Sequence, residues 1–210
     1  MTENAAVTAA IIVIGNEVLS GRTQDVNVQF LALGLGELGI SLDEVRIIAD
    51  VEDEIVSAVN LLRDKYDYVF TTGGIGPTHD DITTASVSKA FGREMIRNPE
   101  AEAILLANYK PEDVTAARMK MADTPDGDDV VLIHNPVSKA PGYQVENVFV
   151  MAGVPRIMQA MFDDLKPRLK GGATVSSRSM DAFIPEGLVA GPLAKVQEEF
   201  PDIEIGSYPF

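Results

Sequence analysis

Cysteine is absent from this chain of 210 residues. Its absence excludes disulfide bonds, thiolate metal sites and a cysteine nucleophile. The chain also lacks an apolar run long enough to span a bilayer. Its first residues, Met1 to Asn4, lack the basic residues of a signal peptide. We therefore expect a cytoplasmic protein with no membrane partner.

Positively charged residues are scarce in this chain. It has 17 Lys and Arg residues against 32 Asp and Glu residues, a formal net charge of -15. Such a field repels phosphate backbones, so we do not expect nucleic acid as a partner. Because the field also opposes anionic ligands, a phosphate site here must use backbone N–H groups, helix dipoles or a metal ion. With 46% hydrophobic residues, the chain can bury a sizeable core.

Strands and helices are predicted to alternate along the first 168 residues. Short apolar segments with the length of buried strands occupy residues 9–14, 42–48, 68–72, 130–133 and 148–151. Helical spacing of apolar residues predicts helices at residues 26–38, 52–65, 82–91 and 155–165, with two peripheral helical pieces around Pro111. Residues 135–142 are rich in turn formers. This alternation favours a three-layer α/β/α domain at residues 1–168, with a mostly parallel sheet.

The pattern restarts in the last 42 residues, 169–210. Residues 180–184 and 203–205 suggest strands, and Pro192 suggests the start of a helix that ends near Phe200. A single β-α-β unit cannot form a core of its own. We therefore expect a small C-terminal α+β appendage that packs on the main domain or on a partner, or that belongs to a small domain cut short.

The strongest motif joins the third predicted strand to a helix and reads Thr-Gly-Gly-Ile-Gly-Pro-Thr-His-Asp-Asp, residues 72–81. Glycine lets backbone N–H groups approach an anion with no Cβ in the way. A helix N-terminus adds free N–H donors and a partial positive charge. On spacing alone, a phosphate site and a plain turn are both open. The candidate ligand-binding residues of this glycine loop are Thr72, Gly73, Gly74, Gly76, Pro77 and Thr78.

Two acids, Asp80 and Asp81, end the glycine loop. One of them is expected to cap the helix that follows, but capping accounts for only one of the two acids. Two carboxylates beside a bound phosphate repel it unless a divalent cation lies between them. The pair therefore suggests Mg²⁺ or another divalent metal, with Asp80 and Asp81 as metal ligands. His79 is interpreted as a polar loop residue, because one histidine does not make a metal site.

Further candidate residues follow the other predicted strands. Each has an ordinary alternative when taken alone, as a solvated loop acid, a helix cap or the first turn of a helix. Because the carboxyl ends of parallel strands share one edge of a sheet, we expect these loops to converge there. These residues are Gly15, Glu17 and Asn27 after the first strand, Asp50 after the second, Ser138 and Lys139 after the fourth, and Gly153 after the fifth.

These motifs together resemble the molybdenum-cofactor biosynthesis fold family, which includes the MoaB and Mog proteins and the molybdopterin-binding part of gephyrin. The resemblance is greatest to the N-terminal domain of competence/damage-inducible (CinA) proteins. It depends on the Gly-Asn-Glu-Val-Leu-Ser-Gly segment at residues 15–21 with Asn27, and on the glycine loop with its acids. It depends also on Asn135-Pro136 with the Ala-Pro-Gly segment at residues 140–142.

The resemblance implies a domain that binds molybdopterin or a similar phosphorylated pterin or nucleotide at the sheet edge. It places the two functional acids of the family on Asp50 and Asp81. Mog-type proteins adenylylate their ligand with magnesium and ATP, whereas CinA-type domains are linked to hydrolysis of ADP-ribose-like pyrophosphates with a divalent metal. Mog-type proteins carry a basic residue before the functional Asp, where this chain has Asp80. That difference favours the CinA branch over an adenylyltransferase.

Three hypotheses follow. The first is a molybdopterin-binding-type domain for a phosphorylated pterin or nucleotide, with catalysis by Asp50 and Asp81 left open. The second is a metal-dependent nucleotide pyrophosphatase that acts on ADP-ribose- or FAD-like dinucleotides. The third is a non-catalytic domain that acts through oligomerisation. The resemblance suggests a homo-oligomer, a dimer or a trimer. The family's usual Leu-Pro-Gly-x-Pro turn reads Met-Ala-Gly-Val-Pro at residues 151–155 here, which affects the geometry of that turn.

Overall fold

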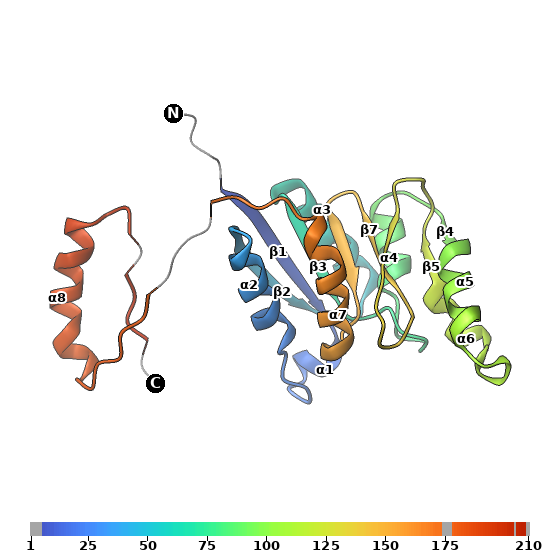
Figure 1. Cartoon of the computed structure of the whole chain (residues 1–210), viewed down its shortest axis with the longest axis horizontal. Helices are drawn as coiled ribbons and strands as arrows, with labels where there is room; N and C mark the ends of the chain where they lie inside the picture. The colour runs from blue at the N-terminus through green and yellow to red at the C-terminus, as the bar shows by residue number, and fades with distance from the viewer. Residues whose placement is uncertain (1–5, 174–177, 204, 209–210) are drawn as a thin grey trace. The chain divides into compact units, whose positions relative to one another are not determined.

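The computed structural model describes residues 6–173, 178–203 and 205–208. The chain divides into two units, Met1–Val175 and Ser176–Phe210, which are described separately here (Figure 1). Among the described residues, no helix is both long and apolar enough to cross a membrane.

A six-stranded sheet forms the middle layer of the first unit, with strand order β2-β1-β3-β8-β7-β6. The strands are β1 (Val7–Ile14), β2 (Ile40–Ile48), β3 (Tyr68–Thr72), β6 (Val131–Ile133), β7 (Gly142–Val145) and β8 (Val148–Met151). Parallel pairing joins β2 to β1, β1 to β3 and β3 to β8, whereas β7 pairs antiparallel with both β8 and β6. The predicted three-layer α/β fold with a mostly parallel sheet is confirmed.

Strand β7 is missing from the sequence prediction, which placed only turns before Gly142. It has four residues, and its turn to β8 is formed by Glu146 and Asn147. Glu146 has a positive φ of 49°. Tight hairpins of this kind are usually marked by Asn-Gly or Asp-Gly, so the Glu-Asn sequence hides the turn.

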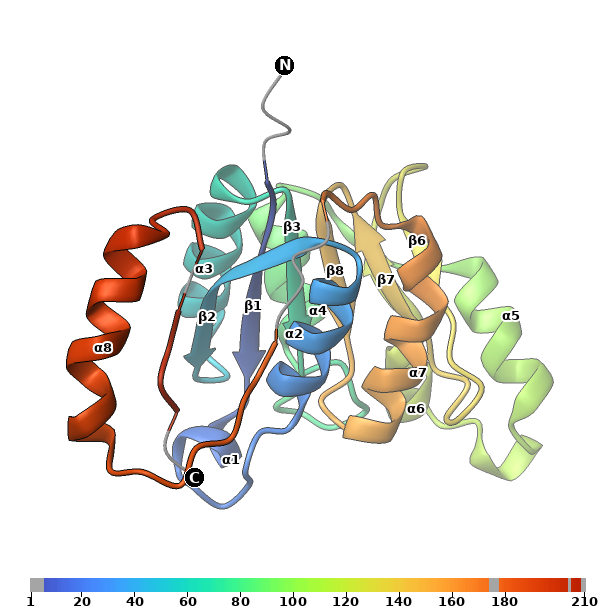
Figure 2. The same ribbon diagram turned by 60° about the vertical axis from the view of Figure 1, so that its left-hand side comes forward.

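Helices cover both faces of the sheet (Figure 2). α2 (Asn27–Glu37) and α7 (Pro155–Leu165) lie on one face, and α3 (Glu52–Lys65) and α4 (Thr83–Ala90) lie on the other. Alternate residues of β1 point into the two cores, because successive side chains of a strand face opposite sides. On the α2 and α7 side the rings of Phe70 and Phe149 stack, with centroids 5.1 Å apart.

An excursion leaves the main layers between α4 and β6. It contains β4 (Met95–Arg97), α5 (Pro99–Asn108), η1 (Pro111–Asp113), α6 (Ala116–Met119), η2 (Lys120–Ala122) and β5 (Asp123–Pro125). β4 and β5 pair antiparallel as a separate two-stranded sheet. Leu105 and Ala122 are fully buried in the core on the α3 and α4 side, so the excursion is anchored to the domain.

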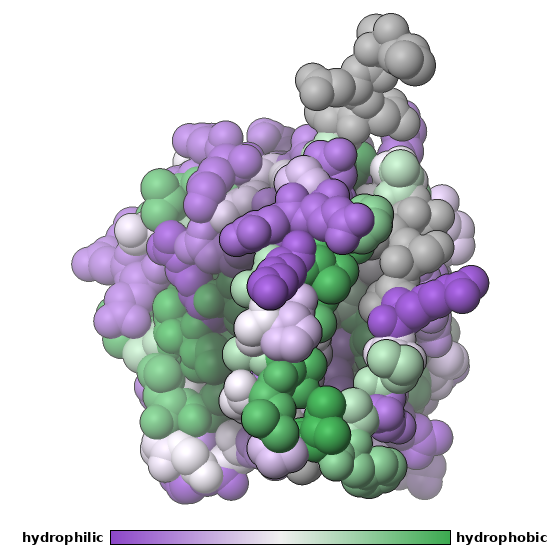
Figure 3. Space-filling model, turned by 90° about the vertical axis from the view of Figure 1, so that its left-hand side faces the viewer, coloured by the Kyte–Doolittle hydropathy of each residue, from purple (hydrophilic) through white to green (hydrophobic). Residues whose placement is uncertain are grey.

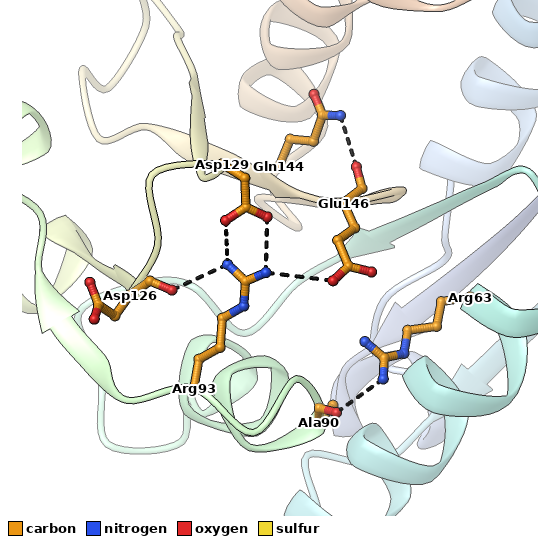
Figure 4. Close-up of polar contacts among 7 residues, drawn as sticks. All are labelled: Arg63, Ala90, Arg93, Asp126, Asp129, Gln144 and Glu146. Carbon is orange, nitrogen blue, oxygen red and sulfur yellow. Dashed lines mark hydrogen bonds and ion pairs between the residues drawn. The ribbon is translucent and has the colours of Figure 1, made fainter.

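A cluster of ion pairs fastens the excursion to the β7–β8 turn, at the sheet edge opposite the carboxyl ends of the parallel strands (Figure 4). The Arg93 guanidinium donates to both carboxylate oxygens of Asp129, at 2.6 and 2.9 Å, and lies 3.5 Å from Glu146 Oε1. It also donates to the carbonyl oxygen of Asp126. Asp129 raises the pKa of Arg93, and the guanidinium lowers the pKa of Asp129 in return.

The second unit contains α8 (Glu186–Glu199), which has no buried residue. The helix begins before Pro192, so the prediction that Pro192 starts it is wrong. The strand predicted at residues 180–184 is absent, because a strand requires a neighbour to satisfy its backbone and the described part of this unit offers none. The strand predicted at residues 203–205 lies partly outside the described residues. Hydrophobic residues are exposed in this unit, including Met180 at 90%, and Figure 3 shows such residues at the surface.

Candidate functional site

Three strand-end loops meet at the carboxyl edge of the sheet, where α1 (Asn16–Leu19) lies in Figures 1 and 2. Gly73 has a φ of 105°, and its N–H donates to the Met151 carbonyl at 3.1 Å. A Cβ on Gly73 would lie 2.1 Å from the Ile14 carbonyl oxygen, and one on Gly153 would lie 3.2 Å from Gly73 Cα. The loops after β1, β3 and β8 therefore touch backbone to backbone, which only glycine allows at Gly73.

Thr83, the first residue of α4, holds the middle of the glycine loop. Its N–H donates to the Gly74 carbonyl at 2.9 Å, and its hydroxyl donates to the Gly73 carbonyl at 3.0 Å. Gly74 has a φ of 67°, and a Cβ there would overlap the Thr83 hydroxyl. In the part of the chain that the structure describes, the N–H groups of Gly74, Ile75 and Gly76 make no hydrogen bond. The loop thus offers three free donors in a row.

The two acids of the loop have different surroundings. Asp81 turns back into the loop, where its Oδ2 accepts from the N–H of Thr78 at 2.8 Å and from the Thr78 hydroxyl. A Cβ on Gly76 would lie 2.7 Å from the same oxygen. Asp80 has an exposed side chain. Thr78 lowers the pKa of Asp80, with smaller contributions from a backbone N–H and the charges of His79 and Lys120, so Asp80 stays ionised near neutral pH.

Neither acid caps α4. The cap residue is Ile82, which makes no side-chain hydrogen bond, so the expectation that Asp80 or Asp81 caps this helix is wrong. The reason is that Thr83 takes over the anchoring of the first turn. Pro77 and His79 are exposed, as expected for polar or turn residues of a loop. Thr72 is buried at 1% exposure, and its hydroxyl has no partner among the residues described.

Lys120 contacts the glycine loop and was missed in the sequence. Its ammonium group donates to the carbonyl oxygens of Thr78, at 2.9 Å, and Asp81, at 2.7 Å. The segment around it is charged and short in apolar residues, so its sequence indicates a peripheral position. No local sequence pattern marks Lys120, whose neighbours Met119 and Ala122 prove to be buried only in the structure.

The first two strand-end loops are also joined. Asp50 Oδ2 accepts from the N–H of Asn16 at 2.8 Å, and the Gly15 N–H donates to the Ile48 carbonyl at 3.1 Å. Asp50 does not cap α3, whose cap residue is Val51, so that alternative is wrong. Glu17 is exposed in α1, with its carboxylate close to Gly15.

Asn27 connects the loop after β1 to the loop after β8. Its Nδ2 donates to the Gly153 carbonyl at 2.8 Å, and the residue is only 4% exposed. Asn27 does not cap α2, because Asp25 accepts from the Val28 N–H there instead. Within the described chain, Asn27 Oδ1 is buried and has no hydrogen-bond partner. It is therefore an acceptor that a ligand or a water molecule could use.

Ser138 and Lys139 lie apart from these contacts. Asn135 Oδ1 accepts from the N–H groups of Val137 and Ser138, and the Ser138 carbonyl accepts from the Tyr109 hydroxyl at 3.2 Å. Lys139 has a positive φ of 68°. It lines an open cleft of about 730 Å³ between the β6–β7 loop, α5 and α7. The contacts that the structure shows for these two residues do not connect them to the glycine loop.

The acid pair of the glycine loop is the predicted site for a metal ion. Across residues 6–173, 178–203 and 205–208, no three His, Asp or Glu side chains form a group that could hold a metal ion. Mg²⁺, however, is usually bound by one or two carboxylates together with substrate phosphates and water. Asp80 and Asp81 supply two carboxylates, and their service as metal ligands stays a prediction.

Comparison with known proteins agrees with this architecture. The model of the probable molybdopterin binding domain matches residues 10–171, and the model of the FAD synthase middle domain matches residues 174–210. A protein of Pyrobaculum calidifontis is 38% identical, over 96% of this chain and 80% of its own length.

Solved structures show the same fold. CinA of Thermoplasma acidophilum superimposes with a TM-score of 0.72 at 33% identity, over 78% of this chain and 98% of that one. MoaB of Thermus thermophilus superimposes with a TM-score of 0.53 at 16% identity, over 78% and 91% of the two chains, which shows the shared fold alone. The chain therefore belongs to the molybdopterin-binding-domain family, with the MoaB/Mog fold and a CinA-like sequence.

Proposed function

We propose that this chain binds a phosphorylated pterin or a nucleotide at the carboxyl edge of its sheet, with the phosphate against the glycine loop. Membership of the family suggests a pterin-type ligand. The observation that carries the proposal is the run of free N–H groups at Gly74, Ile75 and Gly76, within the part of the chain that is described. Adjacent backbone N–H donors in a loop form an anion site without any basic side chain. A chain with a net charge of -15 needs such a site.

The other loops complete the site. Gly15 joins the loop after β1 to the end of β2, and Gly153 brings the loop after β8 into contact with Gly73. Among the described residues, Asn27 Oδ1 and the Thr72 hydroxyl are buried polar atoms without a hydrogen-bond partner, and we propose them as contacts for the part of the ligand beyond the phosphate. A divalent cation would be held by Asp80 and Asp81 and would neutralise charge on the phosphate. Ser138 and Lys139 remain proposed ligand contacts from the adjacent loop.

Isothermal titration calorimetry with ATP, ADP-ribose and a pterin phosphate, each with and without Mg²⁺, tests the proposal. Binding of at least one compound, strengthened by Mg²⁺, is the expected result. A folded sample that binds none of them refutes it and favours the non-catalytic, oligomerising alternative. Light scattering on the same sample tests the predicted dimer or trimer.

A second candidate function is hydrolysis of a pyrophosphate bond in an ADP-ribose- or FAD-like dinucleotide. It is favoured by the positions of Asp50 and Asp81, which both lie at the carboxyl edge, in loops that follow β2 and β3. A cation held by the acids would activate water and stabilise the leaving phosphate. Asp50 would then bind or orient the attacking water from the neighbouring loop.

Turnover of ADP-ribose and FAD with Mg²⁺ or Mn²⁺ tests the hydrolase. Asp81→Asn keeps the shape and an oxygen for the Thr78 N–H but removes the charge, so it should abolish turnover. Asp25→Asn, which changes a carboxylate that accepts from the Val28 N–H, is the matched control and should leave turnover nearly unchanged. Full activity in Asp81→Asn would show that this acid has no catalytic role.

A further inference from the structure

Lys120 is held in a fixed position beside the glycine loop, although it belongs to the excursion. Met119 and Ala122 on either side of it are buried in the core. The Ala122 carbonyl accepts from the Asn98 N–H at 2.9 Å, and β5 begins at the next residue and pairs with β4. The lysine backbone is therefore anchored on both sides, and its ammonium group reaches residues 39 and 42 positions earlier in the chain.

The two carbonyl groups that Lys120 binds lie on either side of the acid pair. The Thr78 carbonyl belongs to the peptide unit that leads into His79, and the Asp81 carbonyl to the unit that leads into Ile82. Because a peptide unit is planar, fixing its oxygen also fixes the direction of its N–H group. Two hydrogen bonds in the described chain connect the carbonyl groups of residues 76–81 to a charged side chain from outside this segment. Lys120 donates both of them.

The loop has a second constraint from within, where Asp81 accepts from Thr78. That contact closes the turn but does not fix it relative to the rest of the domain. Lys120 supplies this external tie, and it also places a positive charge near Asp80 in a strongly acidic protein. Both effects favour a phosphate at the free N–H groups of Gly74 to Gly76.

We infer that Lys120 is a positioning residue of the phosphate site, which holds the turn at Thr78–Asp81 in its binding conformation and offsets the charge of the acids. The expected effect of Lys120 on ligand affinity depends on the proposed function, but its effect on the conformation of the loop can be measured without any ligand. The excursion is thereby part of the site, even though none of its residues follows a strand of the main sheet.

The test compares the wild-type chain with Lys120→Met, Lys120→Arg and Lys110→Met, using calorimetry with MgATP. Lys110 is an exposed lysine of the same excursion and serves as the control. Lys120→Met should weaken ATP binding about tenfold, the effect of losing hydrogen bonds to a charged group. Lys120→Arg, which keeps the charge and donors, should recover part of the affinity, and Lys110→Met should match the wild type.

Amide hydrogen exchange in the absence of ligand is the second readout. Exchange at Thr78 and Asp81, whose N–H groups are hydrogen-bonded within the turn, should be faster in Lys120→Met than in the wild type and Lys110→Met, while exchange in β1 and β3 is unchanged. Equal affinity and equal exchange in Lys120→Met and the wild type would overturn the inference. If the wild type binds no MgATP, the nucleotide form of the proposed function fails, and the exchange rates alone decide whether Lys120 positions the loop.

Discussion

The Asn27 side chain donates to the carbonyl oxygen of Gly153, a residue 126 positions later in the chain. This bond joins the loop after β1 to the loop after β8 across the carboxyl edge of the sheet. It is partly buried, because Asn27 is only 4% exposed whereas Gly153 is exposed. Asn27 and Gly153, two candidate residues from different loops, are thus bonded directly to each other.

Asn27→Ala should destabilise the protein, because it leaves the Gly153 carbonyl without its donor. Loss of a partly buried hydrogen bond costs about 0.5–1.5 kcal/mol of free energy of unfolding, which urea denaturation followed by circular dichroism can measure. Asn108→Ala removes a similar amide-to-carbonyl bond on the surface of α5 and should change the free energy of unfolding by less than about 0.5 kcal/mol. Equal losses in the two variants would mean that the connection between the loops contributes no special stability.

Gly76→Ala should weaken phosphate binding with little loss of stability. The added Cβ would meet Asp81 Oδ2 at 2.7 Å and displace the carboxylate from Thr78. We expect the dissociation constant for MgATP to rise about tenfold, as for the loss of one charge-assisted hydrogen bond.

Gly36→Ala is the control for this change, because a Cβ at Gly36 in α2 meets nothing within 4 Å. Its affinity for MgATP should equal that of the wild type. Calorimetry gives the dissociation constants and thermal unfolding shows that each variant is folded. An unchanged dissociation constant in Gly76→Ala would remove Asp81 and its turn from the binding site.

Glu44 is expected to make stability depend on acidic pH. Hydrogen bonds from Lys65, Tyr66 and Arg46 lower the pKa of Glu44 to about 2 from its ordinary value of 4.5. Since the pKa is lower in the folded state, the stabilisation is complete above pH 4.5 and is lost as the pH falls towards 2.

Glu44→Gln should therefore flatten the fall in free energy of unfolding between pH 4.5 and pH 2. Urea denaturation at a series of pH values measures the profile. Glu112→Gln changes an exposed glutamate outside the ion pairs that the structure shows, and its profile should follow that of the wild type. A Glu44→Gln profile as steep as that of the wild type would mean that other groups control acid unfolding.

Phe70→Ala should be the most destabilising of these changes. Phe70 is fully buried and stacks on Phe149 in the middle of the sheet. Large-to-small changes of this kind cost about 3–5 kcal/mol, because they lose buried apolar surface and leave a cavity. Leu33→Ala, at a position that is 66% exposed on α2, should cost far less. Urea denaturation measures the free energy of unfolding of both variants. Similar losses in the two would contradict the placement of Phe70 in the core.

The elements that determine the site follow directly from the sequence pattern. α3 and α7 begin and end at the predicted residues, and β3 and β8 coincide with their apolar segments. Hydrophobic periodicity is strong in these segments because each is buried against the sheet or forms part of it. With the alternation of strands and helices, this is enough to place the loops after β1, β2, β3 and β8 at one edge.

The rest depends on contacts between distant parts of the chain. Lys120 reaches the glycine loop only because the excursion folds back, and no local pattern encodes that return. The cap assignments for Asp50 and Asn27 were wrong for the same reason, since both side chains bond to another loop instead of the adjacent helix. Residues 180–184 have the composition of a strand but no neighbour to pair with in the described part of their unit.

The close approach of Gly73 to Gly153 has an evolutionary consequence. Where two main chains touch, no side chain can be exchanged to reshape the contact, so the floor of the site is constant across sequences that keep both glycines. Diversification must then occur at the residues around that floor, such as Glu17. A lineage can change which molecule it recognises there while the fold and the backbone of the glycine loop are inherited unaltered.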